Sequence, residues 1–372
     1  MILGLSNDVI VRKESFGGVI FNKNNGVTIE LDKEAYKFVK LFRTPIDVET
    51  ISNKEALNIV KTLFAKGILI ETLNRYKKDE KEGGYPYVVH LGVTSNCNFN
   101  CPCCYRVDEK EMPKDELFRL IDELCSLGVF QLAIGGGEPF LRPDIFEIIE
   151  YCKGKIVCNI TTNGFGMKEN IGRLKGLVQQ INVSLNGFSP LTNIGRDSHA
   201  FGMAVEAINI LSNLKINFGV NILVAKESLL ILQKTFKFLV QLGVKRVVIL
   251  RPKRNKNLWF KTNRLKKEDC ERLKEILEEW EEILDIHIDC SLMELMKDIP
   301  DDKLLKWGIF GCQQSSTICS ITPEGYILPC SFIRTPLGKF TEGSFKEIWH
   351  LCQFRRLREK TRKVNRLPMC EV

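Results

Sequence analysis

The stretch Cys97-Asn98-Phe99-Asn100-Cys101-Pro102-Cys103-Cys104-Tyr105 decides how the rest of this 372-residue chain is interpreted. Cys97, Cys101 and Cys104 follow a C-x3-C-x2-C spacing. Three thiolates on one short loop can ligate three irons of a [4Fe–4S] cluster and leave the fourth iron open to a substrate or cofactor. A zinc site or a buried cysteine loop would also account for the spacing, so sequence further along the chain must decide.

A glycine-rich motif downstream favours the iron–sulfur interpretation. Gly135-Gly136-Gly137-Glu138-Pro139 follows the apolar run Phe130–Ile134, which predicts a buried strand. The cysteine loop and this GGEP motif together resemble the radical S-adenosylmethionine (SAM) superfamily. The residue before the last cysteine is usually aromatic in that superfamily, and here it is Cys103. Cys103 lies outside the spacing, so we interpret it as a non-ligand.

Length and composition describe an ordinary globular protein. The length suggests two or three domains, and the apolar fraction of 44% is typical. No apolar run approaches the roughly 20 residues that span a bilayer, and residues 1–8 do not form a signal peptide. We therefore expect a cytoplasmic location, where clustered members of the 14 cysteines are metal ligands more often than disulfides.

The net charge of +8 is modest, and residues 351–372 hold seven Lys and Arg against two acidic residues. A solvated basic helix is favoured there over a contact with an acidic partner or nucleic acid.

Residues 1–75 predict a small domain of their own. Its expected elements are strands at Val9–Val11, Gly17–Phe21, Val27–Leu31 and Ile68–Ile70, and helices at Lys33–Leu41 and Asn53–Ala65. Asn24-Asn25-Gly26 is a hairpin turn signal, and Asp32 is an expected helix cap. Three strands followed by helices indicate a winged-helix-like module.

This segment resembles the peptide-recognition domain of enzymes that modify ribosomally made peptides, the family of the pyrroloquinoline-quinone peptide chaperone. The resemblance rests on "IELDKEAYKFV" (Ile29–Val39) and "KGILIE" (Lys66–Glu71). It implies that the leader of a precursor peptide binds residues 1–75 as an added strand at an exposed sheet edge. A nucleic-acid-binding winged helix is the alternative, but eleven basic against nine acidic residues give no strong phosphate-binding signal.

Residues 76–86 are charged, end in glycines and predict a linker. Alternating strands and helices then predict a parallel sheet covered by helices. The strands are expected at Val88–Val93, Phe130–Ile134, Ile156–Ile160, Ile181–Leu185, Phe218–Val224 and Val247–Leu250. The helices are expected at Asp115–Leu127, Ile145–Cys152, Leu174–Val178, Met203–Leu211 and Leu229–Gln241. By resemblance this is the partial (β/α)6 barrel of the radical SAM superfamily, over residues 87–262, with functional residues at the carboxyl ends of the strands.

The resemblance also implies which residues bind SAM. They are Tyr105, Gly135, Gly136, Gly137, Glu138, Thr162, Asn163, Ser184, Asn186 and Arg196. Gly135–Glu138 would meet the amino group of SAM, and Arg196 its carboxylate, which a guanidinium fork suits. Ser184 and Asn186 would contact the ribose, although Asn186 stands where relatives often carry Asp. For each residue, an ordinary loop hydrogen bond is the alternative.

Residues 263–372 predict a second iron–sulfur domain. A helix at Lys266–Leu284 and a strand at Ile286–Cys290 precede the segment "GCQQSSTICSITPEGYILPC" (Gly311–Cys330). The spacing of Cys312, Gly325 and Cys330 resembles the SPASM or twitch domains, with Cys319 at the usual third place.

That resemblance implies at least one auxiliary [4Fe–4S] cluster, with a disulfide as the alternative. Glu324-Gly325 would turn Ile318–Thr322 back on Tyr326–Leu328. Cys370 is the expected fourth ligand, and a twitch domain and a shortened SPASM domain both remain open.

The other cysteines are expected in the core, because they share helix or strand faces with apolar residues. They are Cys125, Cys152, Cys158, Cys270 and Cys352. Cys290 differs because it ends a predicted strand, and it is our candidate hydrogen-atom donor.

The sequence thus predicts an α/β radical SAM enzyme that acts on a precursor peptide. By resemblance it would cleave SAM reductively, with an electron from a flavodoxin or ferredoxin. The resulting 5′-deoxyadenosyl radical would abstract hydrogen in a cross-linking, thioether-forming or epimerising reaction. A small-molecule or protein side-chain substrate is the first alternative. A non-catalytic iron–sulfur or DNA-binding regulator is the second, and the Gly135–Pro139 motif disfavours it.

Overall fold

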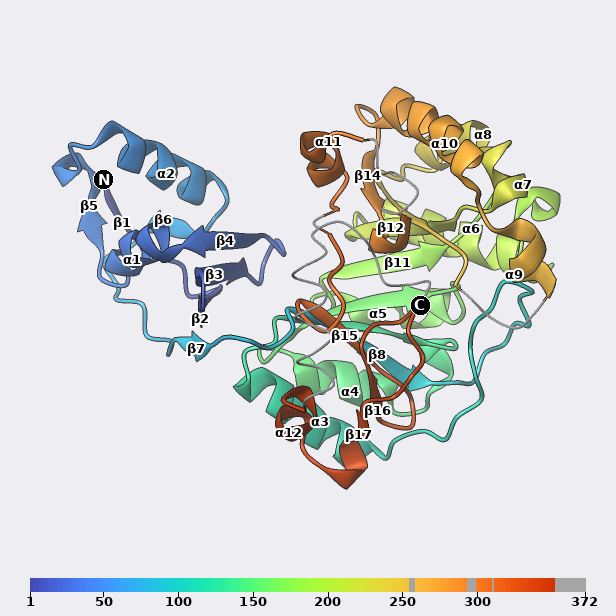
Figure 1. The fold of residues 1–372 in the computed structure, drawn as a ribbon, viewed down its shortest axis with the longest axis horizontal. Coiled ribbons are helices and arrows are strands. Elements are labelled where there is room, and N and C mark those ends of the chain that lie inside the picture. Colours follow the sequence, from blue (N-terminus) through green and yellow to red (C-terminus); the bar gives the residue numbers. More distant parts are fainter. Residues whose placement is uncertain (254–257, 293–298, 310, 352–372) are drawn as a thin grey trace. The chain divides into compact units, whose positions relative to one another are not determined.

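A computed structural model describes residues 1–253, 258–292, 299–309 and 311–351 (Figure 1). The chain divides into two compact units. One comprises residues 1–87 with 121–130, and the other residues 88–120 with 131–372. In the described part of the chain, no helix has the length and apolar character needed to span a membrane.

The first unit contains two small sheets and two helices. A three-stranded sheet has the order β5-β1-β6, and a four-stranded sheet the order β4-β3-β2-β7. The strands are β1 (Ile2–Leu5), β2 (Val9–Glu14), β3 (Gly17–Asn22), β4 (Thr28–Asp32), β5 (Ile46–Asp47), β6 (Leu69–Glu71) and β7 (Lys81–Glu82). The helices are α1 (Lys33–Leu41) and α2 (Lys54–Ala65).

Local chemistry explains why sequence patterns located these elements. The Asp32 carboxylate accepts hydrogen bonds from the backbone N–H of Glu34 and Ala35, and so caps α1 as expected. Asn53 caps α2 in the same way. Strands β1, β5 and β7 were not predicted. The predicted linker packs along this unit, since β7 pairs with β2 and the Tyr76 hydroxyl donates to Val9 O at 2.8 Å.

Strand β4 lies at one edge of its four-stranded sheet. It pairs antiparallel with β3 from Gly17↔Asp32 to Phe21↔Thr28, and the sheet order ends with it. Helix α1 follows it directly and packs on β3 and β4. An edge strand presents backbone N–H and C=O groups to any extended chain beside it.

The second unit is built on one ten-stranded sheet with the order β14-β13-β12-β11-β10-β9-β8-β15-β16-β17. From β14 to β15 all neighbours are parallel, and β16 and β17 add as antiparallel strands (Figure 1). The parallel strands are β8 (Val88–Thr94), β9 (Gln131–Gly136), β10 (Val157–Thr162), β11 (Gln180–Ser184), β12 (Phe218–Leu223), β13 (Arg246–Leu250), β14 (Asp285–Ile288) and β15 (Ile318–Ile321). The last two strands are β16 (Tyr326–Leu328) and β17 (Gly338–Lys339).

Between β8 and β13, helices alternate with the strands as the sequence predicts. The helices of this unit are α3 (Lys114–Ser126), α4 (Ile145–Cys152), α5 (Met167–Leu174), α6 (Ala200–Asn213), α7 (Lys226–Leu229), α8 (Leu232–Gln241), α9 (Leu258–Asn263), α10 (Lys267–Trp280), α11 (Asp301–Lys306) and α12 (Phe345–Trp349). The predicted α/β fold with a mostly parallel sheet is confirmed. The sheet also continues past the six predicted strands, because β14 and β15 extend it at its two sides.

Two predicted helices are wrong in detail. The helix expected at Leu174–Val178 is α5, which ends where that prediction began. Met167 and Leu174, seven positions apart on α5, supply its buried face, and Gly176 adopts a φ of 76° beyond it. The single helix expected at Leu229–Gln241 is two helices, α7 and α8, that break after Leu229.

Candidate functional site

A cavity of about 470 Å³ opens at the carboxyl ends of the parallel strands. The inner face of the sheet lines it with side chains that stand two residues apart, the period of a strand. These residues are His90, Gly92 and Thr94 of β8, Ala133 and Gly135 of β9, Thr161 of β10, Asn182 and Ser184 of β11, Asn221 and Leu223 of β12, and Val248 and Leu250 of β13. Small and polar side chains on this face leave room for a bound molecule.

The cysteine loop closes one side of the cavity. Cys97 and Cys101 are half-buried, Cys104 is exposed, and all three line the cavity. Asn163 Nδ2 lies 3.7 Å from Cys97 Sγ, and the Asp197 N–H donates to Cys101 Sγ at 3.3 Å. Three cysteine thiols along one cavity wall suit the thiolate ligation of an iron–sulfur cluster.

Cys103 also lines the cavity, but its surroundings differ from those of its neighbours. Its backbone N–H donates to Gly195 O at 3.0 Å, which pins this residue to the loop after β11. Burial raises the pKa of the Cys103 thiol to about 12. Burial also raises the pKa of the proposed ligand Cys101, so the feature that sets Cys103 apart is its place outside the C-x3-C-x2-C spacing.

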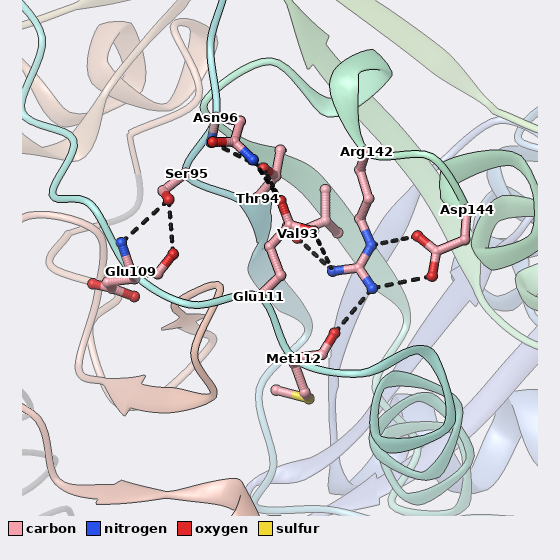
Figure 2. A network of polar contacts seen from close by, with 9 residues as sticks. All are labelled: Val93, Thr94, Ser95, Asn96, Glu109, Glu111, Met112, Arg142 and Asp144. Atoms are coloured by element: carbon pink, nitrogen blue, oxygen red, sulfur yellow. Dashed lines mark hydrogen bonds and ion pairs between the residues drawn. The ribbon is translucent and has the colours of Figure 1, made fainter.

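Arg142 joins the two ends of the cysteine loop (Figure 2). Its side chain is 3% exposed, and it donates to Val93 O at 2.7 Å and to Met112 O at 2.9 Å, just before and just after the loop. Asp144 holds the other side of the guanidinium, with Nε–Oδ1 at 2.6 Å and Nη2–Oδ2 at 3.2 Å. Such a fork–fork pair fixes the plane of the guanidinium. One arginine thus sets the distance between the ends of the segment that carries Cys97 and Cys104.

Further hydrogen bonds hold the two ends of the cysteine loop together (Figure 2). Glu111 Oε1 accepts from Thr94 Oγ1 at 2.5 Å and from Asn96 Nδ2 at 3.0 Å. Ser95 Oγ donates to Glu109 O and accepts from Glu109 N. The residues directly before Cys97 are therefore held on both sides.

Glu138 of the GGEP motif is fully buried and faces protein groups. Its carboxylate accepts from Thr162 Oγ1 at 2.8 Å, from Asn163 N at 2.7 Å and from Phe140 N at 3.3 Å. Burial raises its pKa to about 7, although these hydrogen bonds oppose the rise. Gly135, Gly136 and Gly137 line the cavity and Glu138 does not, so Glu138 ties the ends of β9 and β10 together behind the glycines.

The other expected SAM-binding residues also border the cavity: Tyr105, Thr162, Asn163, Ser184, Asn186 and Arg196. Arg196 Nε is buried and has no hydrogen-bond partner among the described residues. A buried cationic donor without an acceptor suits an anionic ligand. Asn186 is different, because its side chain already donates to Ile194 O and accepts from Leu223 N.

The cavity also contains charged residues that motifs did not reveal. Lys253 Nζ lies 3.9 Å from the ring centre of Tyr105 and 5.1 Å from that of Phe332, in cation–π geometry. Burial lowers the pKa of His90 to about 4, and Lys253 adds to the fall while Asp289 opposes it. Arg251 and Asp289 line the same wall. The alternation along Val88–Val93 could have placed His90 inside, whereas Lys253 follows β13 in no recognisable pattern.

The C-terminal cysteines lie around the hairpin of β15 and β16. The predicted hairpin is confirmed, with Ser320 opposite Leu328 and Ile321 opposite Ile327. Cys319 and Cys330 are buried and Cys312 is half-buried. Burial raises the pKa of Cys319 and of Cys330, with Cys330 adding to the first rise and Cys312 to the second. The three thiols thus influence one another electrostatically.

The remaining cysteines divide into several groups. Cys152, Cys158 and Cys270 are buried as predicted, and Cys125 is half-buried. Cys352 and Cys370 lie outside the described residues. Cys290 is half-buried, and its neighbour Asp289 lines the cavity while Cys290 does not.

Comparison with known proteins agrees with this geometry. The model of the radical SAM superfamily matches residues 91–239, and that of the SPASM iron–sulfur cluster-binding domain matches residues 312–372. The chain is 27% identical to the AdoMet-dependent heme synthase of Methanosarcina barkeri over 77% of this chain and 88% of that protein. It is 25% identical to the PqqA peptide cyclase of Ruegeria pomeroyi over 71% of this chain and 74% of that protein.

Solved structures share the fold. SuiB of Streptococcus suis bound to its precursor peptide SuiA superposes with a TM-score of 0.70 at 20% identity, over 95% of this chain and 89% of SuiB. The protein anSMEcpe with bound AdoMet superposes with a TM-score of 0.56 at 17% identity, over 73% of this chain and 79% of that one.

The radical SAM match therefore includes the cysteine loop and the glycines that line the cavity, and the SPASM match includes the C-terminal cysteine hairpin. The chain is an enzyme with a radical SAM domain and a C-terminal SPASM domain, and it uses a [4Fe–4S] cluster, SAM and at least one auxiliary iron–sulfur cluster.

Proposed function

We propose that this enzyme modifies a ribosomally made precursor peptide whose leader binds residues 1–75. The observation that carries the proposal is the extent of the likeness to SuiB. It covers 95% of this chain and so includes part of the N-terminal domain, and SuiB was crystallised with a precursor peptide. The similarity to a PqqA peptide cyclase supports the same substrate class.

Strand β4 is the proposed docking edge for the leader. An extended peptide can continue the β4-β3-β2 sheet because β4 has a strand neighbour on one side only among the described strands. A bound leader should therefore slow amide hydrogen exchange across Thr28–Asp32 in the full-length enzyme. Exchange in β17, an edge strand of the other unit, should not change.

Within the cavity, we propose Cys97, Cys101 and Cys104 as the ligands of the SAM cluster. When bound, the reduced cluster and SAM supply the radical chemistry. The chain's own residues bind and orient SAM. Gly135 is open to the cavity, since a Cβ there would meet no atom within 4 Å, and Arg196 offers a donor to the SAM carboxylate.

The remaining proposed SAM contacts come from Tyr105, Gly136, Gly137, Thr162, Asn163, Ser184 and Asn186. Glu138 would act from behind the glycines, because its carboxylate already has three protein donors.

We further propose Cys312, Cys319, Cys330 and Cys370 as ligands of an auxiliary cluster. The first three surround one hairpin, and burial disfavours the free thiolates of Cys319 and Cys330, so iron would stabilise the charged form of these two. We also propose that the enzyme works in the cytoplasm with a flavodoxin or ferredoxin as electron donor.

Co-expression with candidate short peptides from the neighbourhood of this gene tests the function. The peptide should change mass only with an intact enzyme, and SAM should be converted to 5′-deoxyadenosine in proportion. The Cys97→Ala enzyme is the matched control. An unmodified peptide that also fails to bind residues 1–75 would favour a small-molecule substrate, the alternative suggested by the similarity to a heme synthase.

Replacing Arg196 with methionine should raise the KM for SAM by about 10-fold or more, the effect of losing a charge-assisted hydrogen bond of about 1.5–3 kcal/mol. SAM cleavage without peptide, followed as 5′-deoxyadenosine against SAM concentration, measures it. Arg173→Met is the control, because Arg173 is 55% exposed on α5 and pairs with Glu150. An unchanged KM would remove Arg196 from the SAM site.

Cys290 is retained as the proposed hydrogen-atom donor, and labelling decides its role. If it returns hydrogen to a peptide radical, Cys290→Ala should abolish deuterium incorporation from D2O into the product. Product labelled as by the wild type would exclude this role.

A further inference from the structure

The segment between two proposed auxiliary-cluster ligands contains buried polar side chains without partners. Gln314, Ser315 and Thr317 stand between Cys312 and Cys319. The Gln314 amide, the Ser315 hydroxyl and the Thr317 hydroxyl are buried and form no hydrogen bond with any described residue. Gln314 is 2% exposed and Ser315 is fully buried, so water does not compensate for the missing partners.

The backbone of the same segment, in contrast, is well satisfied. The N–H groups of Ser316, Thr317 and Ile318 all donate to Gln313 O, at 3.1 to 3.2 Å. The Ser315 N–H donates to Pro329 O at 3.0 Å, which holds this turn beside Cys330. The backbone hydrogen bonds therefore order the turn, and the side chains of Gln314, Ser315 and Thr317 remain available to bind another group.

Ser315 is doubly unfavourable as a purely structural residue. Its φ of 54° lies in the left-handed region, where glycine would be less strained. Its buried hydroxyl lacks a partner as well. Both costs are explained if the hydroxyl has an acceptor other than the described residues of the chain.

We propose that Gln314 Nε2, Ser315 Oγ and Thr317 Oγ1 donate hydrogen bonds to the sulfur atoms of the auxiliary cluster and raise its reduction potential. The proposal rests on the proposed ligands Cys312, Cys319 and Cys330. Reduction adds negative charge to a cluster, so donors aimed at its sulfurs stabilise the reduced form. The three side chains lie on the loop that joins those ligands. A higher potential would suit a cluster that accepts an electron from the substrate.

The test uses the full-length protein, reconstituted anaerobically with iron and sulfide. A background with Cys97, Cys101 and Cys104 all replaced by alanine isolates the auxiliary signal. Thr317→Val keeps the side-chain shape and removes the hydroxyl, while Ser315→Gly removes the hydroxyl and relieves the backbone. Ser316→Ala is the matched control, because the Ser316 hydroxyl already donates to Gln313 O at 3.0 Å.

A redox titration followed by electron paramagnetic resonance gives the midpoint potential. Thr317→Val and Ser315→Gly should each shift the midpoint potential to more negative values with the iron content unchanged. Ser316→Ala should leave the potential unchanged. Thr317→Ser keeps a hydroxyl and should retain the potential of the parent background. If both variants kept the midpoint potential of the parent background, the proposal would be overturned, even if one of them held less iron.

If the protein without Cys97, Cys101 and Cys104 held no iron, Cys312, Cys319 and Cys330 would not bind a cluster, and the proposal would be overturned. Peptide modification by the wild-type enzyme, measured separately, would then show whether the proposed function still stands.

Discussion

Replacing any one of Cys97, Cys101 and Cys104 with alanine should abolish reductive SAM cleavage, whereas replacing Cys103 should leave it in place. Each of the first three lies on the cavity wall in the C-x3-C-x2-C spacing. Loss of one ligand should lower cleavage by more than about 100-fold, beyond what partners outside the ligand shell typically cause. The measurement is 5′-deoxyadenosine formed after reduction with dithionite, together with iron and sulfide per chain.

Cys103 is a demanding control because it lines the same cavity one residue before a proposed ligand. Its N–H is bound to Gly195 O and it lies outside the C-x3-C-x2-C spacing, so an iron should prefer Cys104. A Cys103→Ala enzyme that lost the cluster, beside a Cys104→Ala enzyme that kept it, would reverse this assignment.

Local sequence signals predicted most of the second unit because its parallel strands are short apolar runs bounded by turns. The pairing of β15 with β8 could not be predicted in this way. Ser320 Oγ donates to His90 O across 230 residues of sequence, and no local pattern carries that contact. The C-terminal cysteine hairpin thus joins the same sheet as the cysteine loop, although the two are far apart in the chain.

The candidate site shows the same limit. Cys97 and Gly135 were found because their motifs are contiguous. Lys253 was missed because its role depends on the rings of Tyr105 and Phe332, which only the fold brings together. Glu138 was found by its motif, but its burial and its three protein donors depend on tertiary structure.

Replacing Arg142 with methionine should weaken the whole radical-initiating site, although Arg142 does not line the cavity. The substitution would remove the buried donor that is shared by Val93 O, Met112 O and Asp144. Its expected cost in the free energy of unfolding is about 3–5 kcal/mol. The ends of the cysteine loop would no longer be held together. We expect SAM cleavage to fall by about 10- to 100-fold, as for other residues that orient ligands indirectly, with lower cluster occupancy.

Spectroscopy separates this positioning role from a general loss of stability. Arg142→Met enzyme that still holds a full cluster should show an altered paramagnetic resonance signal on adding SAM and a higher KM for SAM. Arg142→Lys keeps the charge but not the planar fork, so its KM for SAM should fall between those of the wild type and Arg142→Met.

Arg246→Met is the matched control for Arg142. Arg246 binds Asp285 and Gln180, and these three residues begin β13, β14 and β11, at the strand ends opposite the cavity. It should lose stability without changing the SAM-dependent signal. If both arginine variants behaved alike, Arg142 would be a structural residue only. Arg142 lies three residues after the GGEP motif and joins Val93 to Met112. If Arg142→Met alone changed the signal, the two joined ends of the cysteine loop would therefore be the element that sets the geometry between cluster and SAM.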